Sequence, residues 1–210
     1  MKRIWKPLIL VLVAGALGTS LYFQVSLRDD AEHASSLEGL SVGITAGESA
    51  PDFTGITLEG ETIRLSDFRG KIVLLNDFAS WCGPCLAETP HLVDIYNAEG
   101  DDIVFIGLNI EESEANVAGY RDEFNVPYPL VLNPDGALTE IYRPIGLPTS
   151  WFIDPDGVVR YVHAGPMTTP MLQEALDAVR EGREPDVFSV LNYCVLRKNL
   201  KPNNCNLPVF

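Results

Sequence analysis

Two cysteines three positions apart constrain this chain more than any other feature. The run KIVLLNDF at residues 71–78 is apolar and rich in β-branched residues, which is typical of a central strand buried on both faces. It leads into WCGPC at residues 81–85, and a helical pattern of apolar residues continues from there to Gly100. The sequence therefore predicts a strand, a tight loop and a helix, with Cys82 and Cys85 at the start of the helix.

The start of a helix favours a reactive thiol. Its unpaired backbone N–H groups and the positive end of its dipole both stabilise a thiolate. In such motifs the thiolate pKa falls to about 3.5 to 7.5, against about 8.5 for a free cysteine. We expect Cys82 to attack a disulfide of a partner and Cys85, one helical turn further on, to resolve the resulting mixed disulfide. Gly83 and Pro84 shape the turn between them.

Two other interpretations of the cysteine pair remain open. A purely structural disulfide between Cys82 and Cys85 would add little stability, because short loops constrain the unfolded chain least. A zinc site would need Cys194 and Cys205 as further ligands, and these are separated by ten intervening residues, without the paired spacing of common sites. His91 and His163 each stand alone and fit structural roles, so the sequence predicts no metal site and no cofactor.

The rest of the domain continues the alternation of strands and helices. A hairpin is expected where two extended segments flank Glu59-Gly60-Glu61. Further strands and helices follow from apolar periodicity and from the turns at residues 133–136 and 155–157. The sequence predicts an α/β domain over residues 48–182, with extended segments at 50–58, 62–65, 102–109, 129–132, 148–154 and 158–164 and helices at 113–124, 137–142 and 168–181.

The N-terminus has the pattern of an export segment. Residues 8–27 carry no charge and follow a flank with Lys2, Arg3 and Lys6, so residues 1–27 are expected to span a membrane with the basic end on the cytoplasmic side. A cleaved signal peptide, with a processing site near residues 14–16, and a buried helix of the domain are the alternatives. Residues 28–47 are rich in Ser, Gly, Ala and Glu and are expected to be a linker.

The charge balance excludes one class of partner. The chain has 210 residues with 15 Lys plus Arg, 29 Asp plus Glu and a net charge of -14. Its first 27 residues hold three of the basic groups and no acidic one, which leaves 12 against 29, or -17, on the remainder. Without a basic patch, a nucleic-acid partner is not expected. The acidity keeps the domain soluble or selects a basic face on a partner protein.

Combined motifs identify a family resemblance that spans about residues 47–181. The chain resembles the thioredoxin superfamily and, more narrowly, the TlpA/ResA-like membrane-anchored thiol-disulfide oxidoreductases. The resemblance implies a thioredoxin-like fold with a central mixed sheet flanked by helices. It also implies a cis peptide bond at Pro148, next to Thr149, where the backbone pairs with a partner's chain. The motifs are WCGPC at 81–85, APDF at 50–53, GKIVLLN at 70–76, CLAETP at 85–90 and GLPT at 146–149.

Three residues around the cysteines also carry expectations, and that for Glu88 comes from the same resemblance. Glu88 would tune the thiol pKa values and pass protons to Cys85; the alternative is a surface acid near the helix N-terminus. Asn76 stands where thioredoxins carry a buried acid. Trp81 would form a wall beside Cys82 or pack as a core residue.

Asp77 departs from the family pattern, because relatives usually place an aromatic or apolar residue there. A charge on a central buried strand is costly unless it is paired or protonated. The sequence leaves two interpretations open. Asp77 is either an additional proton carrier or a side chain that reaches an exposed rim.

The C-terminal extension, residues 183–210, leaves the family pattern. Cys194 and Cys205 would close a loop of about 12 residues in an oxidising compartment, which in the chain-entropy model contributes up to roughly 3 kcal/mol. A structural disulfide is the first interpretation. An auxiliary redox pair and a tail that docks a partner are the alternatives.

The expected function is extracytoplasmic thiol-disulfide exchange on a protein substrate, in the direction of reduction. The resemblance implies a single-pass protein of the bacterial cell membrane, a membrane electron-donor thiol protein and a role in cytochrome c maturation, with apocytochrome c as substrate. A disulfide-forming oxidase has the same residues. A thiol peroxidase fits less well, since Leu75 and Ala79 replace the Pro and Thr of Pro-x-x-x-Thr-x-x-Cys. A non-catalytic, membrane-tethered adaptor is the remaining alternative.

Overall fold

The structure is a computed structural model that describes residues 40–186. The chain divides into two units, Met1–Leu40 and Ser41–Phe210, and the folded domain belongs to the second. Within residues 40–186, no helix has both the length and the apolar character needed to cross a membrane.

Several sequence-based expectations lie outside the described residues. These are the membrane segment at residues 1–27, the linker as far as residue 39, and the bond between Cys194 and Cys205. They stay predictions.

In the described part, seven strands form one mixed sheet in the order β2-β1-β5-β4-β3-β6-β7. The strands are β1 (Thr54–Thr57), β2 (Thr62–Arg64), β3 (Ile72–Phe78), β4 (Ile103–Asn109), β5 (Leu130–Leu132), β6 (Thr149–Ile153) and β7 (Val159–Ala164). The helices are α2 (Gly83–Glu99), α3 (Glu114–Phe124), α4 (Ala137–Tyr142) and α5 (Thr169–Glu181), with short 3-10 turns at Leu65–Phe68 and Gly100–Asp102.

The strand that precedes the cysteines lies near the middle of the sheet. β3 pairs in parallel with β4 and antiparallel with β6, and all seven of its residues are buried. β4 in turn pairs in parallel with β5. The two β-α-β units, through α2 and α3, therefore bring the carboxyl ends of β3, β4 and β5 to one edge of the sheet.

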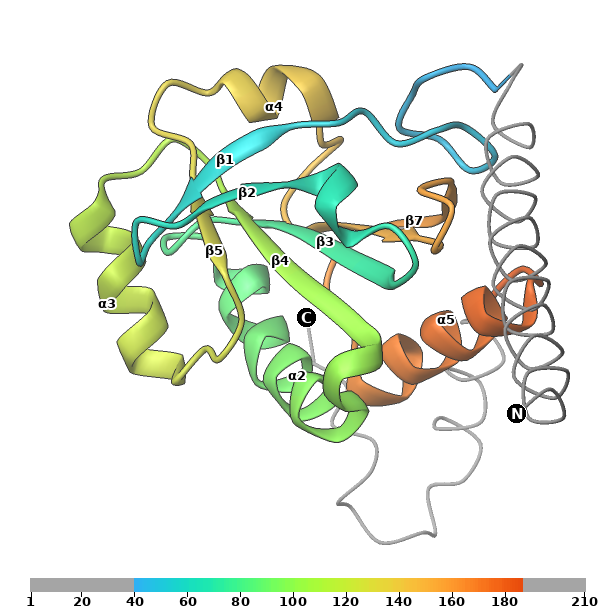
Figure 1. The fold of residues 1–210 in the computed structure, drawn as a ribbon. Helices are drawn as coiled ribbons and strands as arrows, with labels where there is room; N and C mark the ends of the chain where they lie inside the picture. Colours follow the sequence, from blue (N-terminus) through green and yellow to red (C-terminus); the bar gives the residue numbers. More distant parts are fainter. Residues whose placement is uncertain (1–39, 187–210) are drawn as a thin grey trace, which may run out of the picture. The chain divides into compact units, whose positions relative to one another are not determined.

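Alternation along β3 divides the core into two layers, one on each face of the sheet. Leu74 and Phe78 point to the face that α2 and α5 cover, and Val73 and Leu75 point to the opposite face. Figure 1 shows α2 and α5 side by side on one face and α4 on the other. The first layer includes Cys82, Cys85, Leu92, Ile95, Tyr120, Met171 and Leu172; the second includes Phe53, Leu65, Leu138, Tyr142, Trp151 and Ile153.

Contacts at the periphery join segments that are far apart in sequence. The Gly47 N–H donates to Val159 O at 2.8 Å, and Trp151 Nε1 donates to Ile44 O at 3.2 Å, so the chain before residue 48 already packs on the domain. Arg121 of α3 pairs with Glu59, in the turn between β1 and β2, at 3.1 Å. These contacts tie the N-terminal strands to the β-α-β core.

Candidate active site

The two cysteines lie where the sequence predicts them. Cys82 is the N-cap of α2, Gly83 and Pro84 are its first two residues, and Cys85 follows. Cys82 and Cys85 are joined by a disulfide with their Cα atoms 5.2 Å apart. Cys82 Sγ accepts a hydrogen bond from the Cys85 N–H at 3.3 Å. The Cys82 sulfur thus binds one of the backbone N–H groups that have no partner within the helix. This environment stabilises a thiolate.

A carboxyl group is buried one turn behind the cysteines. Glu88 is 1% exposed, so the alternative of a surface acid is wrong. Its Oε1 accepts from the Met167 N–H at 2.9 Å, and its Oε2 accepts from Asn76 Nδ2 at 3.1 Å. Burial raises the pKa of Glu88 from 4.5 to about 8, although the bonds from Met167 and Asn76 oppose that rise. Glu88 can therefore hold or release a proton near neutral pH.

Asn76 connects Glu88 to the neighbouring strand. Its side chain is buried on β3, and its Nδ2 also donates to Ser150 Oγ of β6 at 2.9 Å. The amide is a neutral donor at the place where a second acid would have repelled Glu88. Ser150 and Met167 are members of this network that sequence reasoning missed, because each is more than 70 residues from its partner.

The Leu147-Pro148 peptide bond is cis, which confirms that expectation. Pro148 O accepts from the Gly165 N–H at 2.8 Å, and Thr149 Oγ1 donates to Gly146 O at 2.6 Å. Thr149 pairs with Asp77 across β6 and β3. Pro148 therefore lies beside the carboxyl end of β3, at the edge of the sheet from which the chain runs to Cys82.

Trp81 and the two histidines have distinct surroundings. Trp81 is 69% exposed, so it is not a core residue, and it presents its indole to solvent directly before Cys82. His91 Nδ1 is 2.9 Å from Thr169 Oγ1, and His163 Nδ1 is 3.0 Å from the Tyr161 hydroxyl. The hydrogen bonds fit structural roles for both histidines. Among the residues that the structure describes, no group of three or more His, Cys, Asp or Glu side chains is arranged to hold a metal.

Another buried acid contacts the loop that leads to the cysteines. Glu112 follows β4 and is 7% exposed, and it contacts Ser80 in the loop between β3 and α2. Sequence reasoning missed this pair. The position of Glu112 just after a central parallel strand was the available signal, because functional groups gather at the carboxyl ends of such strands.

Comparison with known proteins agrees with this arrangement. Residues 46–162 match the model of the AhpC/TSA family. The chain belongs to this family. Its relatives include the thioredoxin-like protein YneN of Bacillus subtilis, 31% identical over 84% of this chain and 98% of the relative. The thiol-disulfide oxidoreductase ResA of Geobacillus thermodenitrificans is also 31% identical, over 85% of this chain and 97% of the relative.

Solved structures place this AhpC/TSA protein among thioredoxin-like folds. StoA from Bacillus subtilis aligns with a TM-score of 0.54 at 29% identity, over 60% of this chain and 97% of StoA. A thiol:disulfide interchange protein from Chlorobium tepidum aligns with a TM-score of 0.58 at 27% identity, over 66% and 98% of the two chains. The expectation of a thioredoxin-like α/β fold, with a mixed sheet flanked by helices, is confirmed. The protein is a thiol-disulfide oxidoreductase of the ResA and StoA type.

Asp77 is a buried acid on the central strand of this AhpC/TSA protein. It is 1% exposed, so the interpretation as a residue at an exposed rim is wrong. It points to the face opposite Glu88, and its Oδ2 has no hydrogen-bond partner among the described residues. Burial raises the pKa of Asp77 well above its ordinary value. The Asp77 carboxyl group is therefore costly to ionise in the folded protein. Unfolding exposes it to water, where it ionises freely at neutral pH, so it lowers the free energy of unfolding.

Replacing this acid should stabilise the domain. The Asp77→Val variant removes the buried carboxyl and suits a strand, so we expect its free energy of unfolding at pH 7 to rise by about 1 to 3 kcal/mol. Urea titration of the oxidised protein measures the change. Asp77→Asn is the matched control, since it removes the titration but keeps a buried polar group, and it should gain less. A less stable Asp77→Val protein would show that the carboxyl makes a favourable interaction.

Proposed function

We propose that the protein reduces disulfides of an extracytoplasmic protein partner through Cys82 and Cys85. The observation that carries the proposal is the cysteine pair at the N-terminus of α2 with a buried, proton-holding Glu88 one turn behind it. This arrangement supplies a thiolate, a resolving thiol and a proton acceptor within two turns of one helix.

The proposed reaction has two exchange steps. The Cys82 thiolate attacks one sulfur of the partner's disulfide; the sulfur–sulfur bond breaks, and the other partner sulfur leaves as a thiolate that takes a proton. The ionised form of Glu88, the minority form at neutral pH, then accepts the Cys85 proton. The Cys85 thiolate attacks Cys82 Sγ in the mixed disulfide, and the bond between Cys82 and the partner's sulfur breaks. The partner leaves fully reduced, and Cys82 and Cys85 form the disulfide found in the structure. A membrane thiol protein that donates two electrons would restore the dithiol.

The surface around the cysteines supports a protein partner rather than a small molecule. Trp81, directly before Cys82, is 69% exposed, and Ile145, three residues before Pro148, is 91% exposed. Exposed apolar side chains that flank a reactive group are typical of a protein contact surface. We propose that the backbone at Pro148 and Thr149 pairs with the partner's chain beside its cysteine, and that apocytochrome c is a candidate substrate.

The proposed location depends on the ends of the chain. Residues 1–27 would anchor the protein in the bacterial cell membrane, residues 28–47 would link the anchor to the domain at 48–182, and Cys194 and Cys205 would close a disulfide in the extension. Protease treatment of intact spheroplasts should digest the domain, and mass mapping without reduction should find the second disulfide. A domain protected from protease would contradict the location.

Trapping tests the reaction. Replacing Cys85 with Ser removes the resolving thiol, so the mixed disulfide between Cys82 and its partner should accumulate, and mass spectrometry of the trapped species identifies substrate and donor. Insulin reduction by dithiothreitol separates an enzyme from an adaptor, which would not accelerate it. If the wild type accelerates insulin reduction and Cys85→Ser traps no protein, exchange by this two-step route is excluded.

The redox potential tests the direction. Thioredoxin, a reductant, has a potential of about -270 mV, whereas DsbA, an oxidant, lies near -120 mV. Equilibration of Cys82 and Cys85 with glutathione buffers measures the value. A potential near that of thioredoxin supports the reductase, and one near that of DsbA supports a disulfide-forming oxidase.

A further inference from the structure

The loop that delivers Cys82 to the start of α2 is a β-turn. The Cys82 N–H donates to Ala79 O at 3.1 Å, which makes Ser80 and Trp81 the two central residues of the turn. The turn ends in Cys82 with φ -84° and ψ 105°, an extended conformation that allows its sulfur to cap the helix. Its geometry therefore decides where the Cys82 sulfur lies relative to the helix N-terminus.

The segment after β4 holds this turn. Glu112 Oε2 accepts from the Ser80 N–H at 2.8 Å, and its Oε1 accepts from Ser80 Oγ at 2.5 Å. The Ile110 N–H donates to Phe78 O at 3.0 Å, just before the turn. Three hydrogen bonds from the segment after β4 thus fix the chain between β3 and Cys82.

Asn109 holds Glu112 in place through two hydrogen bonds. Asn109, the last residue of β4, is fully buried; its Nδ2 donates to Glu112 Oε2 at 2.7 Å, and its Oδ1 accepts from the Glu112 N–H at 3.1 Å. The next residue back from Glu112, Glu111, has φ +52°, which is uncommon for a residue other than glycine. The backbone here takes an unusual conformation that presents the Glu112 carboxyl group to the turn.

We propose that Glu112 is a positioning residue for the attacking thiol. It holds Ser80, the turn carries this constraint to Cys82, and the Cys82 sulfur is thereby kept against the N–H groups of α2. Glu112 acts through the turn and contacts no reacting atom. The inference rests on the proposed role of Cys82 as the nucleophile.

Two substitutions separate the contacts of Glu112 from its charge. In Glu112→Gln the amide oxygen can accept from the Ser80 N–H and from Asn109, and the amide nitrogen can donate to the Ser80 hydroxyl, which is both donor and acceptor. In Glu112→Ala all of these bonds are lost. A comparison of the two variants therefore measures the contacts, and a comparison of Glu112→Gln with the wild type measures the charge.

The measurement is the alkylation rate of Cys82 in the reduced protein as a function of pH. We expect Glu112→Ala to react about 10-fold to 100-fold more slowly than Glu112→Gln at neutral pH, because misplaced reacting groups lose rate on this scale. The apparent pKa of Cys82 should be higher in Glu112→Ala than in Glu112→Gln, since the thiolate loses the N–H donors of α2. Glu112→Gln should stay within about threefold of the wild type because its hydrogen bonds survive.

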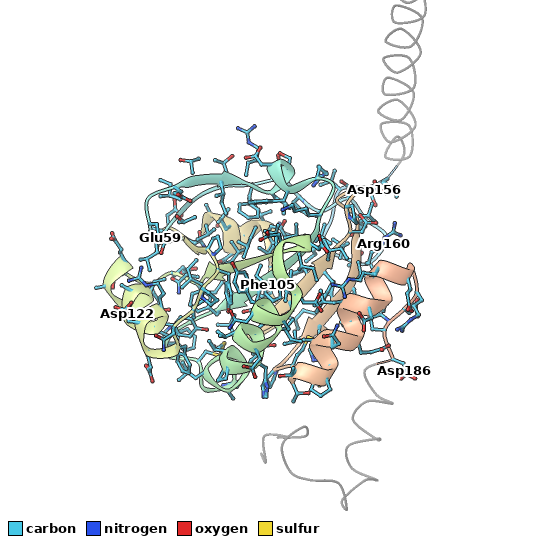
Figure 2. The ribbon with its side chains drawn as sticks, turned by 60° about the horizontal axis from the view of Figure 1, so that its bottom comes forward. Glu59, Phe105, Asp122, Asp156, Arg160 and Asp186 are labelled. Atoms are coloured by element: carbon cyan, nitrogen blue, oxygen red, sulfur yellow. A yellow bond between two sulfur atoms is a disulfide. The ribbon has the colours of Figure 1, made fainter. Side chains whose placement is uncertain are left out.

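Asp154 provides a matched control. It is also 7% exposed; its Oδ1 accepts from the Val158 N–H at 2.8 Å, and its Oδ2 pairs with Arg160 at 2.6 Å. It lies in the turn between β6 and β7, at the end of β6 away from Pro148, where Figure 2 labels Arg160. Asp154→Ala should lose stability in the manner of Glu112→Ala and keep the alkylation profile of Cys82 unchanged.

Equal alkylation profiles for Glu112→Ala and Glu112→Gln would overturn the proposal, as would an equal shift in Asp154→Ala. If Glu112→Ala does not fold, Ser80→Ala takes its place; it removes one of the two bonds, and an unchanged Cys82 profile in that variant overturns the proposal too. Failure of the proposed function looks different, because it shows in the wild type as a Cys82 that does not exchange with insulin.

Discussion

Oxidised Glu88→Gln protein should lose less stability than the wild type as the pH rises from 4.5 to 8. The folded wild type keeps a proton on Glu88 up to a pKa of about 8, whereas the unfolded chain releases it near 4.5. Between these values the folded state binds more protons, so its free energy of unfolding falls with rising pH, and it levels off above pH 8. The whole fall due to Glu88 is about 5 kcal/mol.

Urea titrations of the oxidised wild type and Glu88→Gln at several pH values measure this difference. Burial also raises the pKa of Asp77, so a decline beginning near pH 4 should persist in the variant. Glu174→Gln is a suitable control, because hydrogen bonds from Arg183 lower the pKa of this surface acid and place its titration outside the window. Parallel curves for the wild type and Glu88→Gln would show that Glu88 ionises normally in the folded protein.

Replacing Cys82 should remove the activity. A Cys82→Ser variant has no thiolate to attack the partner, and its hydroxyl is a far weaker nucleophile at neutral pH, so insulin reduction should fall at least about a thousandfold. Cys85→Ser keeps the attacking thiol and should still form the mixed disulfide without turning over. Comparing the two variants therefore separates the attack on the partner's disulfide from the resolution of the mixed disulfide.

The control for this experiment is the fold of the two variants. Cys82 and Cys85 are both buried in the same apolar layer, and Ser changes each site in the same way. Both variants also lose the disulfide, so comparable unfolding midpoints would assign the difference between them to chemistry. Mixed disulfide formed equally well by Cys82→Ser would transfer the role of nucleophile to Cys85.

The central strand and the helix after it follow from the sequence alone. The run at residues 71–78 becomes β3 because its consecutive apolar residues, Ile72 to Leu75, suit a strand that is buried on both faces. The helix begins at Gly83 because Cys82 caps it and Pro84 fits its first turn. Here the determining interactions are local, so a single segment carries the information.

Side-chain partners that are distant in sequence were not predictable. The Met167 N–H that binds Glu88 is 79 residues away, and Ser150 is 74 residues from Asn76. Glu112 reaches Ser80 across 32 residues, and no periodicity records this contact. Such pairs are fixed by how β3, β4 and β6 align in the sheet, which depends on the packing of the whole domain.

The interpretation of Asp77 as a residue at an exposed rim failed for a similar reason. The acid follows Asn76 near the carboxyl end of β3, where a strand often emerges from the core. Two features of this domain prevent that: β6 extends to Thr149 alongside Asp77, and Tyr142 of α4 lies in the layer on the same face. The burial of the Asp77 carboxyl group therefore depends on the assembled sheet and on the helix that covers it.

The most direct test of the account is competitive alkylation of the reduced protein. With limiting iodoacetamide at neutral pH, peptide mapping shows which cysteine reacts first. Cys82 caps α2, where the helix favours its thiolate, whereas the thiol of Cys85 shares its helix with the buried Glu88. We predict that Cys82 is modified well before Cys85. Equal labelling, or faster labelling of Cys85, would contradict the assignment of Cys82 as the attacking thiol.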